Sequence, residues 1–312
     1  MLTITTELLV SSRVSCPVCR SKERTILVKA RHDSPNFLKF IKNERFYGKE
    51  FYDSYNNGPV KELLFEVAEC KNCHFLYLTQ VLSDTGMDLL YNEWLDKELL
   101  KGYYANMPYN IYEELMLSVI NKAFKKKKKR KKLKVMDFGA GYGNFCSIAT
   151  KLGINTYAFD LSTDKNEHME NMGVTIINNL QEFRGSFDFI YVNQVAEHVS
   201  SPGGMLSNLR ECLADDGFMY VATPDSKNAK KELVKNGLSS DFFKFISPHQ
   251  HINAFTNRTL RLLGQNIGLK PFTMFDFMTW LNTSLSSAEL KYVIKRMIKN
   301  SSVGTAIFFK KS

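Results

Sequence analysis

Two patterns of hydrophobic positions divide the chain. Over residues 133–312, short apolar runs alternate with segments of helical period, which predicts an α/β fold with a parallel sheet and helices on both faces. The predicted strands are Leu133–Phe138, Thr156–Phe159, Val174–Ile177, Phe187–Val192, Phe218–Ala222 and Thr305–Phe309. Helices are expected to start near Tyr142, Lys165 and Pro202, and after Thr256 as an N-cap, with Gly268 closing the last one.

The N-terminal part has a different pattern. Short alternating runs at 64–67 and 75–78 predict small strands. Over 84–124, apolar residues recur every three or four positions, which predicts helices. We therefore expect three segments: an N-terminal module over 1–83, a helical connector over 84–132 and the α/β domain over 133–312.

Most of the net charge of +10 comes from one tract. Residues 125–134 read KKKKKRKKLK, with nine basic residues in ten, so the rest of the chain carries 10 − 9 = +1. Such a tract is typical of a solvated helix end or linker. Docking of an anionic partner, such as RNA or a membrane surface, is the alternative. A nucleic-acid partner is therefore possible but not favoured.

Composition excludes several protein classes. The chain has 312 residues, of which 44% are hydrophobic and 24% charged, so it is neither disordered nor disulfide-dense. It has no apolar run of about 20 residues, the length that spans a bilayer. The first residues lack a basic segment followed by an apolar core. We therefore expect a cytoplasmic protein without a membrane span.

Four of the six cysteines form two C-x-x-C pairs, Cys16–Cys19 and Cys70–Cys73. Two such pairs can present four thiolates to one tetrahedral Zn²⁺, and a closed set of four cysteines indicates a structural site. The 51-residue separation between Cys19 and Cys70 requires an inserted subdomain. The alternatives are redox or unpaired thiols. Attachment of c-type haem, which the C-x-x-C-H at 70–74 also matches, would leave the first pair unexplained.

A glycine-rich turn follows the first predicted strand of the α/β domain. Asp137 ends that strand, and Gly139, Gly141 and Gly143 follow it before a helix begins. Glycines let the backbone approach a bound nucleotide closely. Asp160 ends the next strand, 17 residues after Gly143, where a carboxylate can accept hydrogen bonds from ribose hydroxyls.

The glycine spacing discriminates between nucleotide cofactors. A dinucleotide fingerprint requires a third glycine at position 144, where this chain has Asn144. The acid Asp137 would repel a pyrophosphate but suits an ammonium group. The turn therefore favours S-adenosylmethionine (SAM) over NAD, and a glycine turn without a ligand is the simpler alternative.

These motifs resemble those of class I, Rossmann-like SAM-dependent methyltransferases, in the group of ubiquinone and sugar methyltransferases. The resemblance rests on DFGAGYGNF, Asp160, GSFDFIYVNQVAEHV, LADDGFMYVATPD and HQHINAFT, in that order. The N-terminal AECKNCHFLYL is similar to the zinc-knuckle leader of some of these enzymes. The cofactor contacts that the resemblance implies are Asp137, Gly139, Gly141, Asp160, Leu161, Asn179, Leu180 and Asn193.

In the resemblance, Asp137 lies near the methionine amino group and the two glycines pass beneath the methionine. Asp160 would bind the ribose diol, Leu161 would pack on adenine and Asn179 would meet the adenine amino edge. Asn193 would lie beside the transferred methyl.

Four residues are candidates for the catalytic chemistry. Methyl transfer needs a positioned nucleophile that loses its proton. His198 follows Glu197 after the fourth strand and could act as general base, with Glu197 orienting it; a structural histidine is the alternative. His249 and His251 precede the last helix, and alternation would place them on one side of an extended segment.

Some relatives bind a divalent metal through Glu-x-x-Glu-His at the position of His198. This chain has the neutral Gln194 in place of the first carboxylate, which disfavours a hard cation.

The sequence thus predicts a methyltransferase that acts on an oxygen, less favourably a carbon or nitrogen, of a small molecule or sugar conjugate. The alternatives are an RNA or protein methyltransferase that docks through the lysine tract, and a SAM-binding scaffold without turnover. The sequence does not indicate the oligomeric state.

Overall fold

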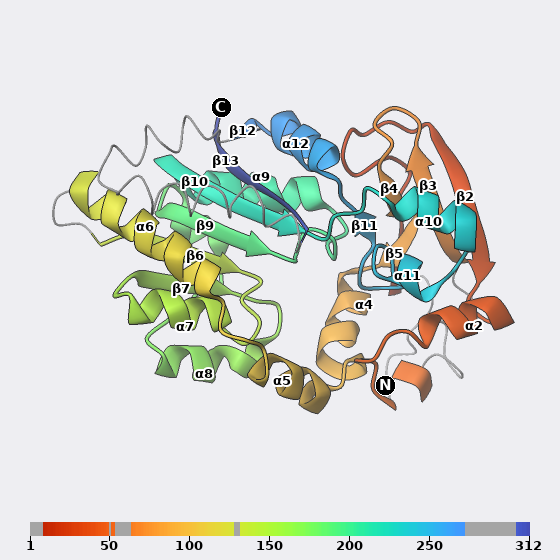
Figure 1. Ribbon diagram of the computed structural model, residues 1–312, viewed down its shortest axis with the longest axis horizontal. Helices are drawn as coiled ribbons and strands as arrows, with labels where there is room; N and C mark the ends of the chain where they lie inside the picture. The colour runs from red at the N-terminus through yellow and green to blue at the C-terminus, as the bar shows by residue number, and fades with distance from the viewer. Residues whose placement is uncertain (1–8, 50, 54–63, 128–131, 272–303) are drawn as a thin grey trace. The chain divides into compact units, whose positions relative to one another are not determined.

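A computed structural model describes residues 9–49, 51–53, 64–127, 132–271 and 304–312 (Figure 1). The chain packs as two compact units, each with its own core. The first combines Met1–Asn106 with Ala196–Gly203 and Pro224–Leu263, and the second combines Met107–Val195, Gly204–Thr223 and Gly264–Ser312. Each unit is therefore built from segments that are distant in the sequence, and the division into 1–83, 84–132 and 133–312 stays a prediction.

The second unit contains a seven-stranded sheet in the order β12-β13-β10-β9-β6-β7-β8. The strands β6 to β10 pair in parallel, whereas β13 is antiparallel to both of its neighbours. Their bounds are β6 (Lys134–Phe138), β7 (Asn155–Phe159), β8 (Thr175–Ile176), β9 (Phe187–Asn193), β10 (Leu213–Thr223), β12 (Leu269–Pro271) and β13 (Thr305–Lys311). All six predicted strands are confirmed, and the structure adds β12.

Helices cover both faces of this sheet (Figure 1). They are α6 (Ile111–Lys127), α7 (Asn144–Lys151), α8 (Asn166–Asn171), α9 (Pro202–Cys212) and α12 (Asn257–Asn266), with short 3₁₀ turns η3 (Thr163–Lys165) and η4 (Leu180–Phe183). One core cluster joins the apolar sides of α6 and α7 to β6, β9 and β10. The hydroxyl of Thr256 accepts the Thr259 N–H at 3.3 Å, which confirms the predicted N-cap of α12. The predicted α/β class is confirmed.

The first unit is built on a four-stranded antiparallel sheet in the order β11-β4-β3-β2, and a separate β1-β5 pair. Their bounds are β1 (Val10–Ser12), β2 (Arg24–Arg31), β3 (Leu64–Cys70), β4 (Leu76–Leu78), β5 (Gln80–Leu82) and β11 (Asn253–Ala254). The two strands predicted beside the second cysteine pair are confirmed as β3 and β4. Because β11 pairs with β4, this sheet includes residues far beyond the predicted N-terminal module.

Helices and an aromatic core complete the first unit. The helices are α2 (Pro35–Ile41), α4 (Asp84–Leu89), the π-helix η2 (Leu90–Trp94), α5 (Lys97–Ala105), α10 (Ala229–Asn236) and α11 (Ser240–Phe243). Phe37, Phe40, Phe51, Phe65 and Phe242 are fully buried in one cluster. The insert between the cysteine pairs therefore supplies core, which explains its aromatic composition.

The lysine tract begins on the last turn of α6, which ends at Lys127. Residues 128–131, in the middle of the tract, lie outside the described residues.

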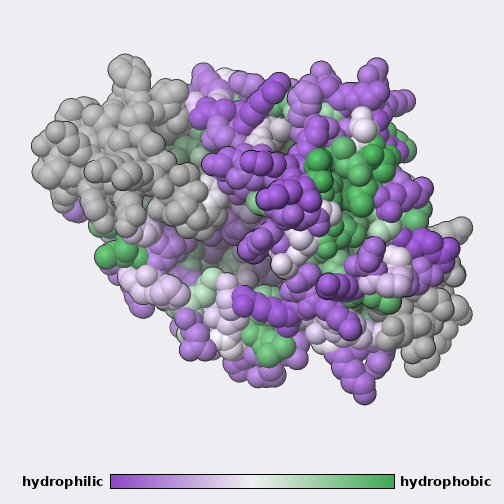
Figure 2. All heavy atoms as spheres, turned by 45° about the vertical axis from the view of Figure 1, so that its right-hand side comes forward, coloured by the Kyte–Doolittle hydropathy of each residue, from purple (hydrophilic) through white to green (hydrophobic). Residues whose placement is uncertain are grey.

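Figure 2 shows hydrophilic and hydrophobic surface interleaved over one face of the molecule. Among the helices described, none has the length and apolarity needed to cross a lipid bilayer.

Candidate functional site

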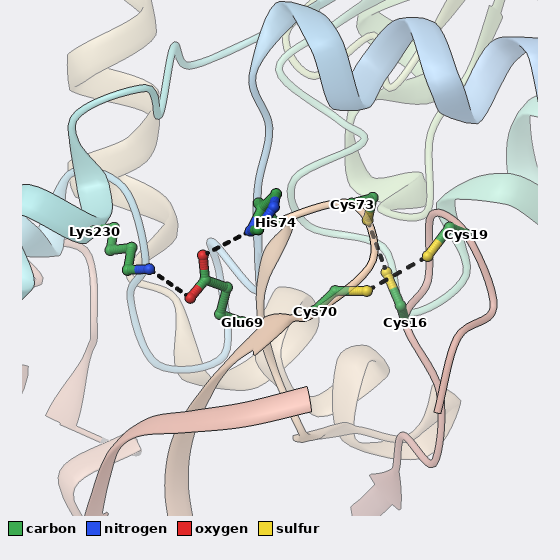
Figure 3. A network of polar contacts seen from close by, with 7 residues as sticks. All are labelled: Cys16, Cys19, Glu69, Cys70, Cys73, His74 and Lys230. Carbon is green, nitrogen blue, oxygen red and sulfur yellow. Dashed lines mark hydrogen bonds and ion pairs between the residues drawn. The ribbon is translucent and has the colours of Figure 1, made fainter. Parts of the chain in front are cut away.

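The two C-x-x-C pairs converge in the first unit (Figure 3). Cys16 Sγ lies 3.6 Å from Cys73 Sγ, and Cys19 Sγ lies 3.4 Å from Cys70 Sγ. All four sulfurs fall within 4.8 Å of one another, and none is in a disulfide. A tetrahedron with metal–sulfur bonds of about 2.3 Å separates its sulfurs by about 3.8 Å. The predicted cluster of four cysteines is confirmed, and its spacing fits one zinc ion.

The two cysteine loops have the same backbone geometry. In the first, Arg20 N–H donates to Cys16 O at 2.9 Å, and in the second, His74 N–H donates to Cys70 O at 2.9 Å. Both donors have a left-handed φ of 61°. This turn points the two thiols of each loop the same way. The backbone turn of each loop therefore places its two sulfurs side by side, as the C-x-x-C spacing predicts.

A second polar group lies beside the cysteine cluster (Figure 3). Glu69 on β3 accepts a hydrogen bond from Lys230 Nζ of α10 at 2.7 Å, and its other oxygen lies 3.3 Å from His74 Nδ1. The Glu69 carboxylate is largely buried, whereas Lys230 and His74 are exposed. The Lys230 ammonium therefore pairs with the charge of Glu69, and the His74 ring lies beside the same carboxylate.

The glycine-rich turn of the second unit closes on Asp160. The carboxylate of Asp160 accepts the Gly141 N–H at 2.7 Å and the Ser162 N–H at 2.9 Å. Gly139 and Gly141 have φ values of +78° and +54°, which disfavour any residue with a side chain. At Gly139 a Cβ would also lie 2.4 Å from Val195 Cγ2. The predicted glycines and acid are thus brought together in one turn at the end of β6.

Asp137 lies next to this turn and is buried. Burial raises the pKa of Asp137 to about 8, and the charges of Glu113 and Asp160 add to that rise, while a hydrogen bond from Cys146 Sγ at 3.4 Å opposes it. An ammonium group would favour the ionised carboxylate. Asp137 is therefore a buried carboxyl group that a neighbouring cation would ionise, and its contact with the cofactor stays a prediction.

Glu113 is a candidate that sequence reasoning missed. Tyr191 is the register partner of Asp137 on β9, and its hydroxyl donates to Glu113 Oε1 at 2.6 Å. Burial raises the pKa of Glu113. Glu113 lies on α6, 24 positions before Asp137 in the sequence. The one signal in the sequence that could have indicated it is an acidic residue in the first turn of a predicted helix.

The remaining predicted cofactor residues lie on the second unit in different settings. Leu161 follows Asp160 and is 62% exposed, which is unusual for a leucine and leaves an apolar side chain uncovered. Asn179 caps η4 by accepting the Gln181 N–H at 3.0 Å, and Leu180 begins that turn. Asn193 is the last residue of β9 and half-buried. Leu161 therefore has the surface that stacking on a base requires, whereas Asn179 already has a structural role.

The first unit brings together Glu197, His198 and His251. His198 Nε2 lies 3.8 Å from Glu197 Oε1, and the His198 and His251 rings are 4.9 Å apart. One potential ligand atom from each residue falls within 4.8 Å of the others. The three side chains form a compact group that could hold a proton or a cation.

Burial dominates the electrostatics of this group. Glu197 is 1% exposed, and neither carboxylate oxygen has a hydrogen-bond partner among the described residues. Burial raises the pKa of Glu197 to about 8 and lowers that of His198 to about 3, to which nearby His251 contributes. The pKa of His251 is also lowered by burial. At neutral pH the group therefore consists of a protonated or partly ionised Glu197 beside neutral imidazoles.

His249 lies apart from this group. The segment before α12 turns at His249, where φ is 67°, so it is not the extended segment that alternation implied. The buried His249 ring packs 5.5 Å from His32 and 6.0 Å from Phe51 in the aromatic core. Burial lowers its pKa to about 4. The two histidines thus have different surroundings, and only His251 meets His198.

Comparison with protein families matches residues 109–273 to the family described as a methyltransferase domain. The match covers more than half of the chain and contains the glycine-rich turn, Asp160 and the Glu197 group. The chain belongs to the methyltransferase domain family. The sheet of parallel strands with helices on both faces is the fold that the sequence predicted, so the predicted fold and family are confirmed.

The chain is similar to curated proteins at 25 to 30% identity. The ubiquinone biosynthesis O-methyltransferase of Caulobacter sp. (strain K31) is 30% identical over 131 residues, which is 38% of this chain and 51% of the relative. The enzyme of the same name from Actinobacillus pleuropneumoniae serotype 7 is 25% identical over 178 residues, 49% of this chain and 75% of its own length. The chain thus spans about half the length of the first relative.

Among solved structures, the plantazolicin methyltransferase BamL, in complex with a triazolic desmethylPZN analog and SAH, is 14% identical. The alignment covers 72% of this chain and 93% of BamL with a TM-score of 0.49.

The buried state of Glu197 predicts an unusual pH dependence of stability. With a folded pKa of about 8, the folded chain keeps a proton that the unfolded chain loses at a lower pH. Stability therefore falls as pH rises from about 5 to about 8, by at most about 1.4 kcal/mol per pH unit.

We expect urea unfolding to show wild type losing stability over this range relative to Glu197→Gln. The exposed Glu98→Gln should track wild type, and parallel curves for Glu197→Gln and wild type would contradict the buried, unpaired carboxylate.

Proposed function

We propose that this chain transfers the methyl group of SAM to a hydroxyl oxygen of a small molecule or sugar conjugate. The glycine-rich turn closed by Asp160 carries the proposal, because this arrangement, in a methyltransferase domain, offers backbone room and a carboxylate for a nucleoside. The O-methyltransferase names of the two relatives support an oxygen acceptor. The buried, proton-holding group of Glu197 and His198 supports a step that removes a proton.

In this proposal the second unit binds the cofactor. Each oxygen of Asp160 accepts one backbone N–H and keeps a lone pair that can accept a hydrogen bond from a ribose hydroxyl. The exposed side chain of Leu161 covers one face of the adenine. Asp137, with Glu113 near it, receives the ammonium of the methionine part. Asn179, Leu180 and Asn193 complete the proposed contacts on the same unit.

Binding of S-adenosylhomocysteine (SAH) tests the cofactor assignment. We expect micromolar affinity by calorimetry, no NAD binding, and a loss of about tenfold or more in Asp160→Asn, because a charged acceptor is lost. Since the ligand's ammonium lowers the pKa of Asp137, binding near pH 7 should release protons, seen as a heat that depends on the buffer. Asp137→Asn should abolish that release.

The matched control is Asp215→Asn, because Asp215 is fully exposed in the same unit. NAD binding would overturn the choice of cofactor, and binding of neither ligand would overturn the proposed activity.

The proposed reaction is an in-line displacement. The acceptor oxygen forms a bond to the methyl carbon, the carbon–sulfur bond breaks, and SAH leaves with the electron pair. The hydroxyl proton passes to the pair of Glu197 and His198. His198 is reachable, with a side chain 19% exposed, whereas the pKa of Glu197, about 8, is near the value that suits a base at neutral pH. We therefore assign proton acceptance to the pair, with His198 in contact with the acceptor.

A panel of phenols, catechols and nucleotide-activated sugars tests the acceptor and the base. We expect one probe class to gain one CH₂ unit by mass spectrometry, and His198→Gln or Glu197→Gln to slow turnover by about 10² to 10⁴ while SAH affinity is unchanged. The exposed His168→Gln is the control.

Each alternative gives a different result in that assay. Methylation of RNA that weakens steeply with salt would replace the small acceptor. If neither His198→Gln nor Glu197→Gln changes turnover, the base assignment is wrong.

The cysteine cluster is proposed to hold one structural zinc ion. Four sulfurs with tetrahedral spacing close the coordination sphere, so no position is left for a substrate. We expect about one zinc per chain by elemental analysis after dialysis, and its loss, with a lowered melting temperature, in Cys19→Ser. Cys212→Ser, which changes a buried thiol at the end of α9, should retain zinc. Equal zinc in all three proteins would contradict the site.

A further inference from the structure

Arg13 forms an unusually large number of contacts in the first unit. Its Nη1 lies 2.9 Å from Asn253 Oδ1 and 3.4 Å from the carbonyls of Leu78 and Ile252. Its Nη2 donates to the carbonyls of Val199 and Ser200 at 3.1 and 2.8 Å. One guanidinium thus contacts five acceptors, from segments between 65 and 240 residues away in the sequence.

These acceptors lie directly beside the group of Glu197, His198 and His251. Val199 and Ser200 immediately follow His198, and Ile252 and Asn253 immediately follow His251. Both loops that carry the group are therefore attached to the same side chain, one or two residues from the functional positions.

Asn253 connects the two loops further. Its Nδ2 donates to the carbonyls of Ala196 and Val199 at 3.0 and 2.7 Å, while its Oδ1 accepts from Arg13. The Glu197 carbonyl also accepts the N–H groups of Ile252 and Asn253, at 2.9 and 3.1 Å. Ala196 and Val199 flank Glu197 and His198 on both sides. The backbone around the proposed proton acceptor is thus held on every side by Arg13 and Asn253.

Arg13 also belongs to the cysteine module. Arg13 precedes Cys16 by three residues. Its backbone N–H donates at 2.7 Å to the carbonyl of Thr79, the residue that follows β4. β4 follows Cys73 and pairs with β11, in which Asn253 lies opposite Tyr77. The first cysteine loop is therefore preceded by Arg13, and the second is followed by β4, whose next residue accepts the Arg13 backbone N–H.

The chemistry of arginine suits this position. Burial lowers the pKa of Arg13 to about 10, so it remains a cation at neutral pH. A planar guanidinium can donate in several fixed directions, whereas the ammonium of lysine is a single compact charge. Losing it would remove the donor to Ser200 O and Asn253 Oδ1, whereas Val199 O and Ile252 O keep Asn253 Nδ2 and the Leu78 N–H as donors.

We propose that Arg13 is a positioning residue for methyl transfer, through which the zinc-binding module holds Glu197, His198 and His251 in their buried arrangement. The inference rests on the proposed function for its catalytic meaning, since it assigns those residues to the acceptor side. The N-terminal module then has a specific task, which is to hold the proton-accepting group in place around the buried Glu197.

A histidine titration tests the inference without an acceptor. In the full chain labelled with ¹⁵N-histidine, nuclear magnetic resonance should show His198 and His251 resisting protonation well below their ordinary pKa. The groups facing them are Glu197, each other, and the Arg13 cation held near their loops. In Arg13→Lys we expect water to enter, so that both histidines titrate near the ordinary value of about 6.5.

The controls separate positioning from general stability. Arg31→Lys changes an exposed arginine on β2 of the same unit and should leave the titration of His198 and His251 as in wild type. Cys19→Ser should shift His198 and His251 as Arg13→Lys does, because the module is then released. If Arg13→Lys does not fold, Asn253→Ala provides the same comparison.

A lower melting temperature in Arg13→Lys with unchanged histidine titrations would overturn the inference and leave Arg13 as a stabilising residue only. SAH affinity should be equal in wild type and Arg13→Lys, because the proposed cofactor contacts belong to the other unit. Absence of SAH binding in wild type would overturn the proposed function, while the histidine titrations would still decide the positioning role.

Discussion

The convergence of two cysteine loops is the constraint on which the first unit depends. The loops of Cys16–Cys19 and Cys70–Cys73 have the same turn geometry and bring four sulfurs within bonding distance of one centre. An ion bound there would link two segments separated by a long insert, and its binding energy would contribute to folding. The insert packs its aromatic residues into the core. The strand β4 follows the second cysteine loop and pairs with β11.

Buried ionisable groups mark both candidate sites. Asp137 in one unit and Glu197 in the other have pKa values raised to about 8 by burial, and each lies beside further titratable groups. A protein that only needed stability would gain by replacing such groups with apolar ones. Retaining carboxylates that hold protons near neutral pH is a feature of sites that bind cations or move protons.

The N-terminal segment that carries the cysteine cluster and the proposed catalytic group are linked by hydrogen bonds between residues that are far apart in the sequence. The leader contributes Arg13, and later segments contribute the loops after His198 and His251. Asn253 provides the remaining contacts between these loops. This arrangement would give the proposed structural metal site a physical role, because the backbone around a buried, unpaired carboxylate needs rigid support.

Local patterning in the sequence was enough to predict the six strands, the N-cap of α12, the cysteine cluster and the glycine turn with Asp160. These features depend on neighbours in the chain: strand periodicity, the C-x-x-C turn and glycines that allow positive φ. Only the tertiary structure joined β11 to the leader sheet, placed Glu113 near Asp137, separated His249 from His251 and surrounded Arg13 with acceptors. Those contacts span up to 240 residues, and their geometry follows from packing, which no local pattern encodes.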